Sequence, residues 1–217
     1  MTSALARDQM IEQQVRPWDV LDQDVLDVMR QIPREQFVPE AYRRLAFADI
    51  EIPLAHGEAM LAPKFEGRLL QALSIEKNDT VLEIGTGSGY LTACLAALGA
   101  RVVSCERHSD LSAQAADRLR LLSRHSNVEL LAIDVSEQMP AGEYDVVAVE
   151  GSMPVIDQRL IALTRPGGRL FVVTGTAPIM EARLITKTNA TGWREEILFE
   201  TILKPLHGFE AAAAFVF

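Results

Sequence analysis

The segment VLEIGTGSGY, residues 81–90, constrains the fold of this chain more than any other stretch. An apolar run ends around Glu83 and passes into three glycines at alternate positions, Gly85, Gly87 and Gly89. Such a run is typical of a buried parallel strand, and glycines directly after it let the backbone come close to a ligand. The segment predicts the first strand and the ligand-binding loop of an α/β domain.

Strand and helix patterns alternate after this loop. Apolar runs rich in Val, Ile and Leu predict strands at 80–85, 101–106, 128–134, 144–151 and 167–175, with helices expected at 89–99, 109–125 and 155–165. This alternation indicates a doubly wound, mostly parallel sheet covered on both faces. The residues from 182 onward read as antiparallel edge strands of the same sheet.

The first 79 residues have a different pattern, which predicts a helical cap and a substrate loop. Helical spacing of apolar residues predicts a helix over 22–32, opened by Asp22 or Asp24, and another over 63–73, while 50–63 read as an extended segment leading into a loop. No low-complexity linker interrupts the chain. We therefore expect a single domain over 1–217, with cap and substrate loop at 1–79 and a Rossmann-like core at 80–217.

Charge and composition exclude several classes of function. The formal net charge is −9 with no basic cluster, which argues against binding to nucleic acid or to anionic membranes. The polar N-terminus does not resemble a signal peptide, and no apolar run approaches the roughly 20 residues of a membrane span, so we expect a cytoplasmic protein. Cys94 and Cys105 are expected to be buried thiols, and the spacing of His, Cys, Asp and Glu predicts no metal site.

Two ligand classes bind to a glycine loop of this kind, dinucleotides and S-adenosylmethionine. The dinucleotide pattern GxGxxG would place its third glycine at position 90, where this chain has Tyr90. Glu83 would repel a pyrophosphate but suits the ammonium and sulfonium groups of S-adenosylmethionine, which carries no phosphate. The loop therefore favours S-adenosylmethionine.

Two further acids support the same ligand. Glu106 closes the second expected strand, where a carboxylate can accept both ribose hydroxyls, and Asp134 closes the third, where we expect it beside the adenine. Tyr90 could equally begin the core of the following helix. The predicted cofactor-binding set is Glu83, Gly85, Thr86, Gly87, Ser88, Gly89, Tyr90, Glu106, Arg107, Asp134, Val135 and Glu150.

Several stretches together resemble the protein-L-isoaspartate (D-aspartate) O-methyltransferases. The resemblance covers most of the chain, and its stretches are MIEQQVRPWDVLDQDVLDVMRQIPREQFVPEAY, IPLAHGEAMLAP, VLEIGTGSGYLTACLA, RVVSCER, RPGGRLFVVTG and LKPLHG. It implies a methyltransferase that uses S-adenosylmethionine and acts on the stray carboxylate of isoaspartyl residues in damaged proteins. A monomer or weak dimer is expected.

The implied reaction needs no general base, because a carboxylate with a pKa near 4 is already ionised at neutral pH. The enzyme has to align oxygen, methyl carbon and sulfur and exclude water. Leu61, His56 and Ser152 are the residues that we expect near the reacting carboxylate, with Leu61 standing where the family has the serine of its Thr-Ile-Ser loop.

The chain departs from the family pattern at three places. Ala59-Met60-Leu61 replace the Thr-Ile-Ser loop, Ile133-Asp134-Val135 replace Gly-Asp-Gly, and Glu150 stands where the family has a small neutral residue. An acid at Glu150 would oppose an anionic substrate unless it is paired. Two alternatives therefore stay open: a methyltransferase of this shape with another acceptor, in which Glu150 or His56 would act as a base, and a non-catalytic S-adenosylmethionine-binding protein.

Overall fold

A twisted sheet of seven strands forms the centre of the molecule. The computed structural model describes residues 2–122 and 126–210. The strands lie in the order β5-β4-β3-β6-β7-β8-β9; they are β3 (Thr80–Ile84), β4 (Arg101–Cys105), β5 (Val128–Leu131), β6 (Tyr144–Met153), β7 (Thr164–Thr176), β8 (Ile179–Lys187) and β9 (Trp193–Thr201).

The direction of the strands follows the expected pattern. The first five pair in parallel, and β8 and β9 add antiparallel pairs at one side. The chain runs outward from β3 through β4 to β5 and then crosses to β6 on the other side of β3. The prediction of a doubly wound, mostly parallel sheet with antiparallel C-terminal edge strands is confirmed.

Helices cover both faces of the sheet because its central strands are apolar on both sides. Val81 of β3 and Val146 of β6 pack against α3 (Pro63–Leu73), α4 (Tyr90–Leu98) and the N-terminal helices. Leu82 and Val147, the next residues along the same strands, point the other way and pack against α6 (Gln158–Leu163). The remaining helix of the core, α5 (Ser109–Leu121), follows β4.

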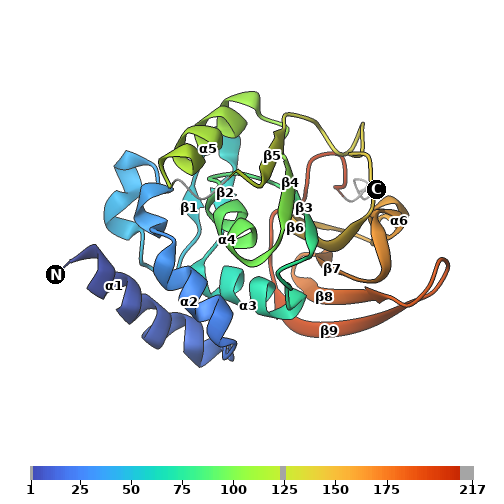
Figure 1. The fold of residues 1–217 in the computed structure, drawn as a ribbon, viewed down its shortest axis with the longest axis horizontal. Coiled ribbons are helices and arrows are strands. Elements are labelled where there is room, and N and C mark those ends of the chain that lie inside the picture. Colours follow the sequence, from blue (N-terminus) through green and yellow to red (C-terminus); the bar gives the residue numbers. More distant parts are fainter. Residues whose placement is uncertain (1, 123–125, 211–217) are drawn as a thin grey trace, which may run out of the picture.

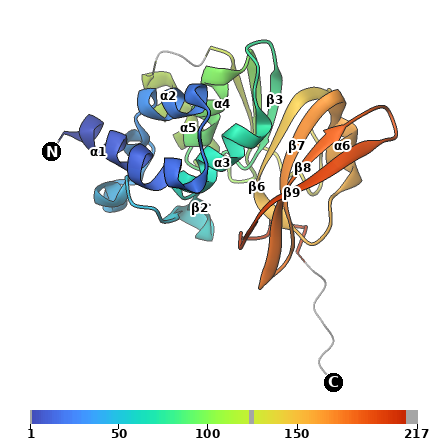
Figure 2. The same ribbon diagram turned by 90° about the horizontal axis from the view of Figure 1, so that it is seen from below.

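The N-terminal residues form a helical cap beside α3 and α4, at the opposite side of the molecule from β8 and β9 (Figures 1 and 2). It consists of α1 (Ser3–Met10), a π-helical turn (Ile11–Val15), a 3-10 turn (Arg16–Trp18), α2 (Gln23–Gln31) and two further 3-10 turns (Arg34–Gln36 and Glu40–Leu45). The Asp22 side chain accepts the amides of Asp24 and Val25 at 2.9 and 3.3 Å, so Asp22 is the N-cap of α2.

A short hairpin leads from the cap to α3. β1 (Ile52–Pro53) pairs antiparallel with β2 (Ala59–Met60) around a 3-10 turn (Ala55–Gly57). His56, in this turn, has a φ of 60° in the left-handed region, which is uncommon for a residue other than glycine. The hairpin lies in the segment for which the sequence predicted a substrate loop, and its tip lies near the start of α5.

Two other expectations concern burial and membranes. Cys94 and Cys105 are free and buried as predicted, and burial raises the pKa of both thiols, that of Cys105 to about 12. Within the described ranges, no helix combines the length and the apolar character that crossing a bilayer requires.

Candidate cofactor and substrate site

A cavity of roughly 1110 Å³, including space open to solvent, lies at the carboxyl ends of β3, β4 and β5. This is the edge of a doubly wound sheet where ligands bind, beside the point at which the strand order reverses between β3 and β6. The wall combines the glycine loop, the ends of three strands, the hairpin and the C-terminal segment; it is made of residues 51, 57–61, 66, 84, 85, 87, 88, 91, 105–107, 133–135, 150, 151 and 203–207.

The glycine loop forms the floor of this cavity because its backbone adopts conformations that other residues avoid. Gly85, Gly87 and Gly89 all have positive φ, at 103°, 50° and 84°. A Cβ on Gly85 would lie 3.1 Å from Cβ of Glu150, and one on Gly89 would lie 3.0 Å from Cβ of Ala115. Gly85 and Gly87 line the cavity directly, whereas Gly89 allows α5 to pack closely behind it.

Glu106 lies between the glycine loop and the start of α5. Its Oε2 accepts the amide of Gly87 at 2.9 Å and its Oε1 accepts the amide of His108 at 2.9 Å. Each carboxylate oxygen can accept a second hydrogen bond, so the side chain is fixed in place and retains one acceptor on each oxygen. The residue lines the cavity, and its geometry matches the predicted contact with two ribose hydroxyls.

Asp134 lies at the far end of the cavity, after β5. Its Oδ1 accepts the amide and the hydroxyl of Ser136, at 2.9 and 2.6 Å, and its Oδ2 faces Arg107 at 4.0 Å and His207 at 3.9 Å. Burial opposes ionisation, but the Ser136 hydrogen bonds and the two cations outweigh it and lower the pKa of Asp134. Arg107, Asp134 and Val135 therefore form one wall, as expected for an adenine subsite.

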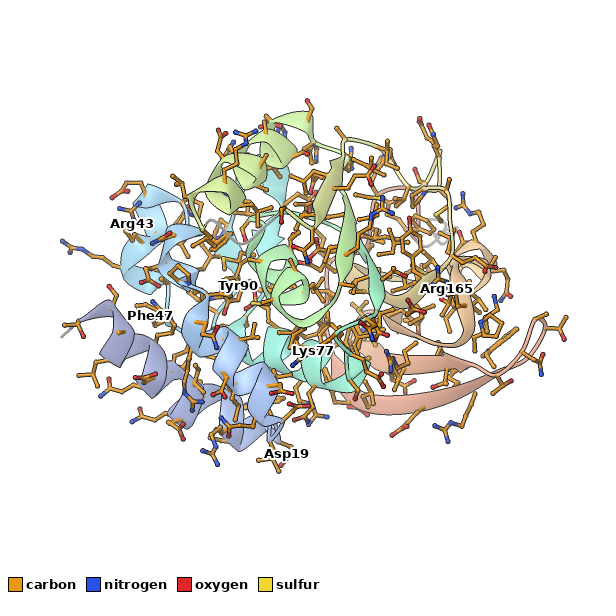
Figure 3. All side chains as sticks on the ribbon, in the orientation of Figure 1. Asp19, Arg43, Phe47, Lys77, Tyr90 and Arg165 are labelled. Atoms are coloured by element: carbon orange, nitrogen blue, oxygen red, sulfur yellow. The ribbon has the colours of Figure 1, made fainter. Side chains whose placement is uncertain are left out.

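Four predicted cofactor residues do not line the cavity: Gly89, which allows α5 to pack behind the loop, and Tyr90, Thr86 and Glu83. Tyr90, labelled in Figure 3, is fully buried. It packs against Phe37 and under the guanidinium of Arg34, so it belongs to the helix core, the alternative that its position had left open. Thr86 bonds to the hydroxyl of Ser104. Glu83 is fully buried behind the wall, where it accepts the hydroxyls of Thr92 at 2.6 Å and of Ser104. At this position Glu83 cannot contact the ammonium group of S-adenosylmethionine directly. The carboxyl group of Glu150 lines the cavity in its place.

Glu83 and Glu150 form a buried carboxyl pair. The two carboxyl groups lie close enough to affect each other's pKa, and Oε1 of each is buried without a hydrogen-bond partner among the described residues. Burial raises the pKa of both, and the neighbouring Glu83 raises the pKa of Glu150 further. The protonated, neutral form is therefore favoured at Glu150, the acid that lines the cavity.

The hairpin forms the wall opposite the glycine loop. Leu61, one of the predicted substrate residues, lines the cavity with Ala59 and Met60, and these three residues make an apolar part of the wall beside Glu58. Its position depends on the buried Arg34, whose guanidinium donates to the carbonyl of Leu61 at 2.6 Å and pairs with Glu66. Burial raises the pKa of Glu66, to about 8, against the opposing effect of Arg34.

The other two predicted substrate residues lie outside the cavity wall. Ser152 is fully buried and donates its hydroxyl to the carbonyl of Leu203 at 2.7 Å, so it secures the C-terminal segment. His56 lies on the outer rim, where its Nε2 contacts Asp110. The prediction that Ser152 contacts the substrate directly is wrong, because its side chain points from β6 toward the C-terminal segment.

The structure adds wall residues that the sequence patterns did not single out. Lys204 and Leu206 come from the C-terminal segment, which bridges to β6 at Ser152↔Pro205. Nζ of Lys204 lies 2.8 Å from Oε1 of Glu58 and 3.1 Å from the carbonyl oxygen of Gly57, and so joins this segment to the hairpin across the mouth. The only sequence signal for them was the LKPLHG stretch, which has no chemical pattern of its own.

Comparison with known proteins agrees with this architecture. The family model for protein-L-isoaspartate (D-aspartate) O-methyltransferase matches residues 5–208. A protein-L-isoaspartate O-methyltransferase from Aeropyrum pernix is 35% identical over 207 residues, which cover 94% of this chain and 80% of that protein. Another from Rhodopseudomonas palustris is 36% identical over 214 residues, with coverage of 97% and 86%.

Solved structures show the same fold. A crystal structure from Plasmodium falciparum, described as a protein-L-isoaspartate O-methyltransferase in complex with S-adenosyl-L-homocysteine, superposes with a TM-score of 0.82 at 21% identity, covering 93% of this chain and 98% of that one. The family match extends over the cap, the hairpin and the core together. The chain therefore belongs to the protein-L-isoaspartate (D-aspartate) O-methyltransferase family.

Proposed function

We propose that this protein transfers the methyl group of S-adenosylmethionine to the free carboxylate of isoaspartyl residues in damaged proteins or peptides. The observation that carries the proposal is the cavity in which the glycine loop, Glu106 and Asp134 meet an apolar hairpin, in a chain that belongs to this family from cap to core. The named relatives supply the substrate class.

The donor fits the cavity from one end to the other. Its adenine would lie between Arg107, Asp134 and Val135, and its ribose hydroxyls would bond to the free acceptors of Glu106. The glycine loop would lie under its methionyl part, with the carboxylate of Glu106 beside it, where a pyrophosphate would be repelled. This distribution of acids supports a cationic sulfonium ligand over a dinucleotide.

The chemistry requires little of the side chains. A carboxylate oxygen attacks the methyl carbon in line with sulfur, the carbon–sulfur bond breaks, and the electron pair returns to sulfur. An anion and a sulfonium cation become two neutral products, so a dry apolar wall favours the transition state by weakening the solvation of the charged reactants. Leu61 and Met60 supply such a wall.

The raised pKa of Glu150 weakens an objection to an anionic acceptor. A carboxylate at that position would repel the substrate by several kcal/mol at short range in a low-dielectric site. Burial and the neighbouring Glu83 favour the protonated form of Glu150, which carries no charge. Lys204 at the mouth adds a cation from the opposite side, where it pairs with Glu58.

A second acceptor class is favoured by one observation. The side chains of Ala59, Met60 and Leu61 present no hydrogen-bond donor to the cavity, and a less polar acceptor would meet no unpaired group there. In that case a nucleophile weaker than a carboxylate would need a base, and no unpaired histidine lines the described cavity for that task. The carboxylate acceptor therefore remains the better proposal.

The test is transfer of labelled methyl from S-adenosylmethionine to an isoaspartyl peptide and to its aspartyl twin. We expect base-labile label, released as methanol, on the isoaspartyl peptide alone. Calorimetric binding of S-adenosylhomocysteine is measured in parallel. Tight binding of the product without transfer to either peptide would reject the acceptor, and tighter binding of NAD than of S-adenosylhomocysteine would reject the donor as well.

A further inference from the structure

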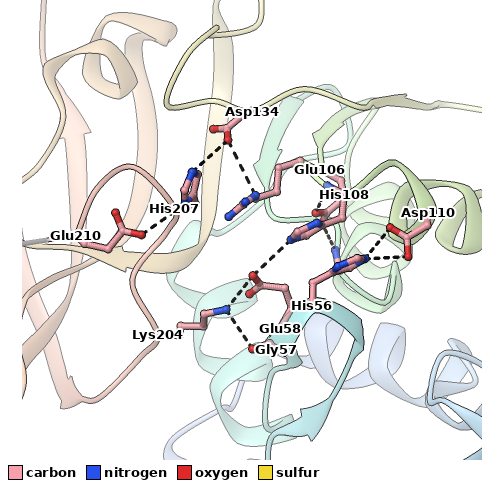
Figure 4. A network of polar contacts seen from close by, with 12 residues as sticks. His56, Gly57, Glu58, Glu106, His108, Asp110, Asp134, Lys204, His207 and Glu210 are labelled. Atoms are coloured by element: carbon pink, nitrogen blue, oxygen red, sulfur yellow. Dashed lines mark hydrogen bonds and ion pairs between the residues drawn. The ribbon is translucent and has the colours of Figure 1, made fainter.

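Metal-ligating side chains from two distant segments gather at the rim of the cavity. His56 and Glu58 belong to the hairpin, while His108 and Asp110 belong to the turn before α5 and to its first residues (Figure 4). His56 and Asp110 are 54 positions apart in the sequence. Sequence spacing could not predict this cluster, because the fold alone brings the two segments together.

Three of these residues lie close enough together to bind one metal ion. One donor atom from each of His56, His108 and Asp110 lies within 4.8 Å of the others. Nε2 of His56 lies 2.9 and 3.0 Å from the two carboxylate oxygens of Asp110. The two imidazole rings stack in parallel, with centroids 4.0 Å apart and planes 4° apart.

An ion pair between His56 and Asp110 does not account for the second histidine. Nε2 of His108 is buried and accepts or donates no hydrogen bond within the described part of the chain, and its contact with Oε1 of Glu58 is long, at 3.7 Å. A buried ring nitrogen without a partner is unfavourable.

We propose that His56, His108 and Asp110 bind a divalent transition-metal ion of the Zn²⁺ type, with Glu58 or water as the fourth ligand. Imidazole nitrogen and carboxylate oxygen are ordinary Zn²⁺ ligands at about 2.0–2.2 Å, which places neighbouring donor atoms roughly 3.3 Å apart in a tetrahedron. The rings therefore leave the stack, and donor atoms that lie up to 4.8 Å apart close by about 1.5 Å to reach this spacing. The exposed side chains of His56 and Asp110 can make that movement without disturbing the core.

The position of the site connects it to both halves of the cavity. The amide of His108 holds Oε1 of Glu106 at 2.9 Å, and Gly57 and Glu58, which follow His56, line the wall. A bound ion would join the hairpin to α5 and so hold the hairpin in place over the cavity. This inference concerns ion binding alone and does not depend on the methyl acceptor.

The experiment measures ion binding directly on the full chain. Protein freed of metal with a chelator is titrated with Zn²⁺ by calorimetry and with Co²⁺ by its visible absorption. We expect one ion per chain and an intense tetrahedral Co²⁺ spectrum. His56→Ala and His108→Ala should each weaken Zn²⁺ binding at least about tenfold, and Asp110→Asn should weaken it as well.

His207→Ala is the matched control, because His207 is a half-exposed histidine on the same cavity rim but outside the cluster. Its Zn²⁺ affinity should equal that of the wild type. Hydrogen exchange of amides in residues 55–61 should slow on adding Zn²⁺ to the wild type and not to His56→Ala. No uptake by the wild type, or equal losses in the control and in His56→Ala, would overturn the proposal. If His108→Ala fails to fold, the exposed positions His56 and Asp110 decide the question.

Discussion

Glu150→Gln tests the carboxyl pair that closes one side of the cavity. Because burial raises the pKa of both carboxyls, we expect Glu83 and Glu150 to share a proton in the folded wild type, whereas in the unfolded chain both lose their protons above their usual pKa of about 4.5. Folding should therefore take up a proton at neutral pH. Glutamine keeps a donor toward Glu83 and carries no charge in either state, so the variant lacks the contribution of Glu150 to this proton uptake.

The magnitude follows from this proton. Because the folded-state pKa of Glu150 is raised, the stability that the pair contributes is fully present below the unfolded pKa and is lost as pH rises toward the folded pKa. In that window the wild type loses about 1.4 kcal/mol of unfolding free energy per pH unit from this group. The variant does not lose this free energy. The difference between its melting temperature and that of the wild type should therefore increase by roughly 3–5 °C per pH unit as the pH rises.

The assay is thermal unfolding of wild type and Glu150→Gln at pH 5, 6, 7 and 8. Taking the difference between the two proteins cancels the titration of groups that they share. Glu196→Gln, at an exposed position on β9, is the control for loss of one carboxylate. A constant difference between wild type and Glu150→Gln across the range would refute the shared proton. Turnover of Glu150→Gln on an isoaspartyl peptide should stay near that of the wild type, because both residues are neutral.

Three further substitutions probe other parts of the site. Glu106→Ala removes charge-assisted hydrogen bonds to the ribose, each worth roughly 1.5–3 kcal/mol, so the affinity for S-adenosylhomocysteine should fall at least tenfold by calorimetry; unchanged affinity would contradict the ribose contact. Leu61→Ser replaces part of the apolar wall with a polar side chain and should lower turnover on the isoaspartyl peptide, whereas a rise would show that a hydrogen-bond donor to the carboxylate matters more than the dry wall. Arg34→Met leaves Glu66 buried without its partner and should destabilise the fold by about 3–5 kcal/mol in denaturant unfolding, and the double variant Arg34→Met/Glu66→Leu should regain much of that loss.

The sequence alone determined the features that depend on local pattern. The apolar runs from 80 to 175 predicted each parallel strand, and the helices between them, because strand and helix periods are read over a few residues. The glycine loop, Glu106 and Asp134 were located in the same way, since strand ends in a parallel sheet share one edge. The family resemblance over the cap and hairpin agreed with the comparison over 5–208.

The tertiary structure decided which way each side chain points and what it meets. Tyr90 follows the glycine loop in sequence but turns into the core under Arg34, and Ser152 turns toward Leu203. Glu83 lies behind the wall, where it adds to the effect of burial in raising the pKa of Glu150. None of these contacts joins neighbours in sequence, so no local pattern could encode them.

At the rim of the cavity, too, the sequence determined the residues and the tertiary structure determined their neighbours. Lys204, Glu58 and the trio of His56, His108 and Asp110 belong to segments whose own patterns carry no metal-binding signal. The sheet brings these segments together because the chain returns to one edge after every strand. The sequence shows which side chains each segment carries. The contact between His56 and His108 exists only in the folded molecule, because packing sets the distance between their rings.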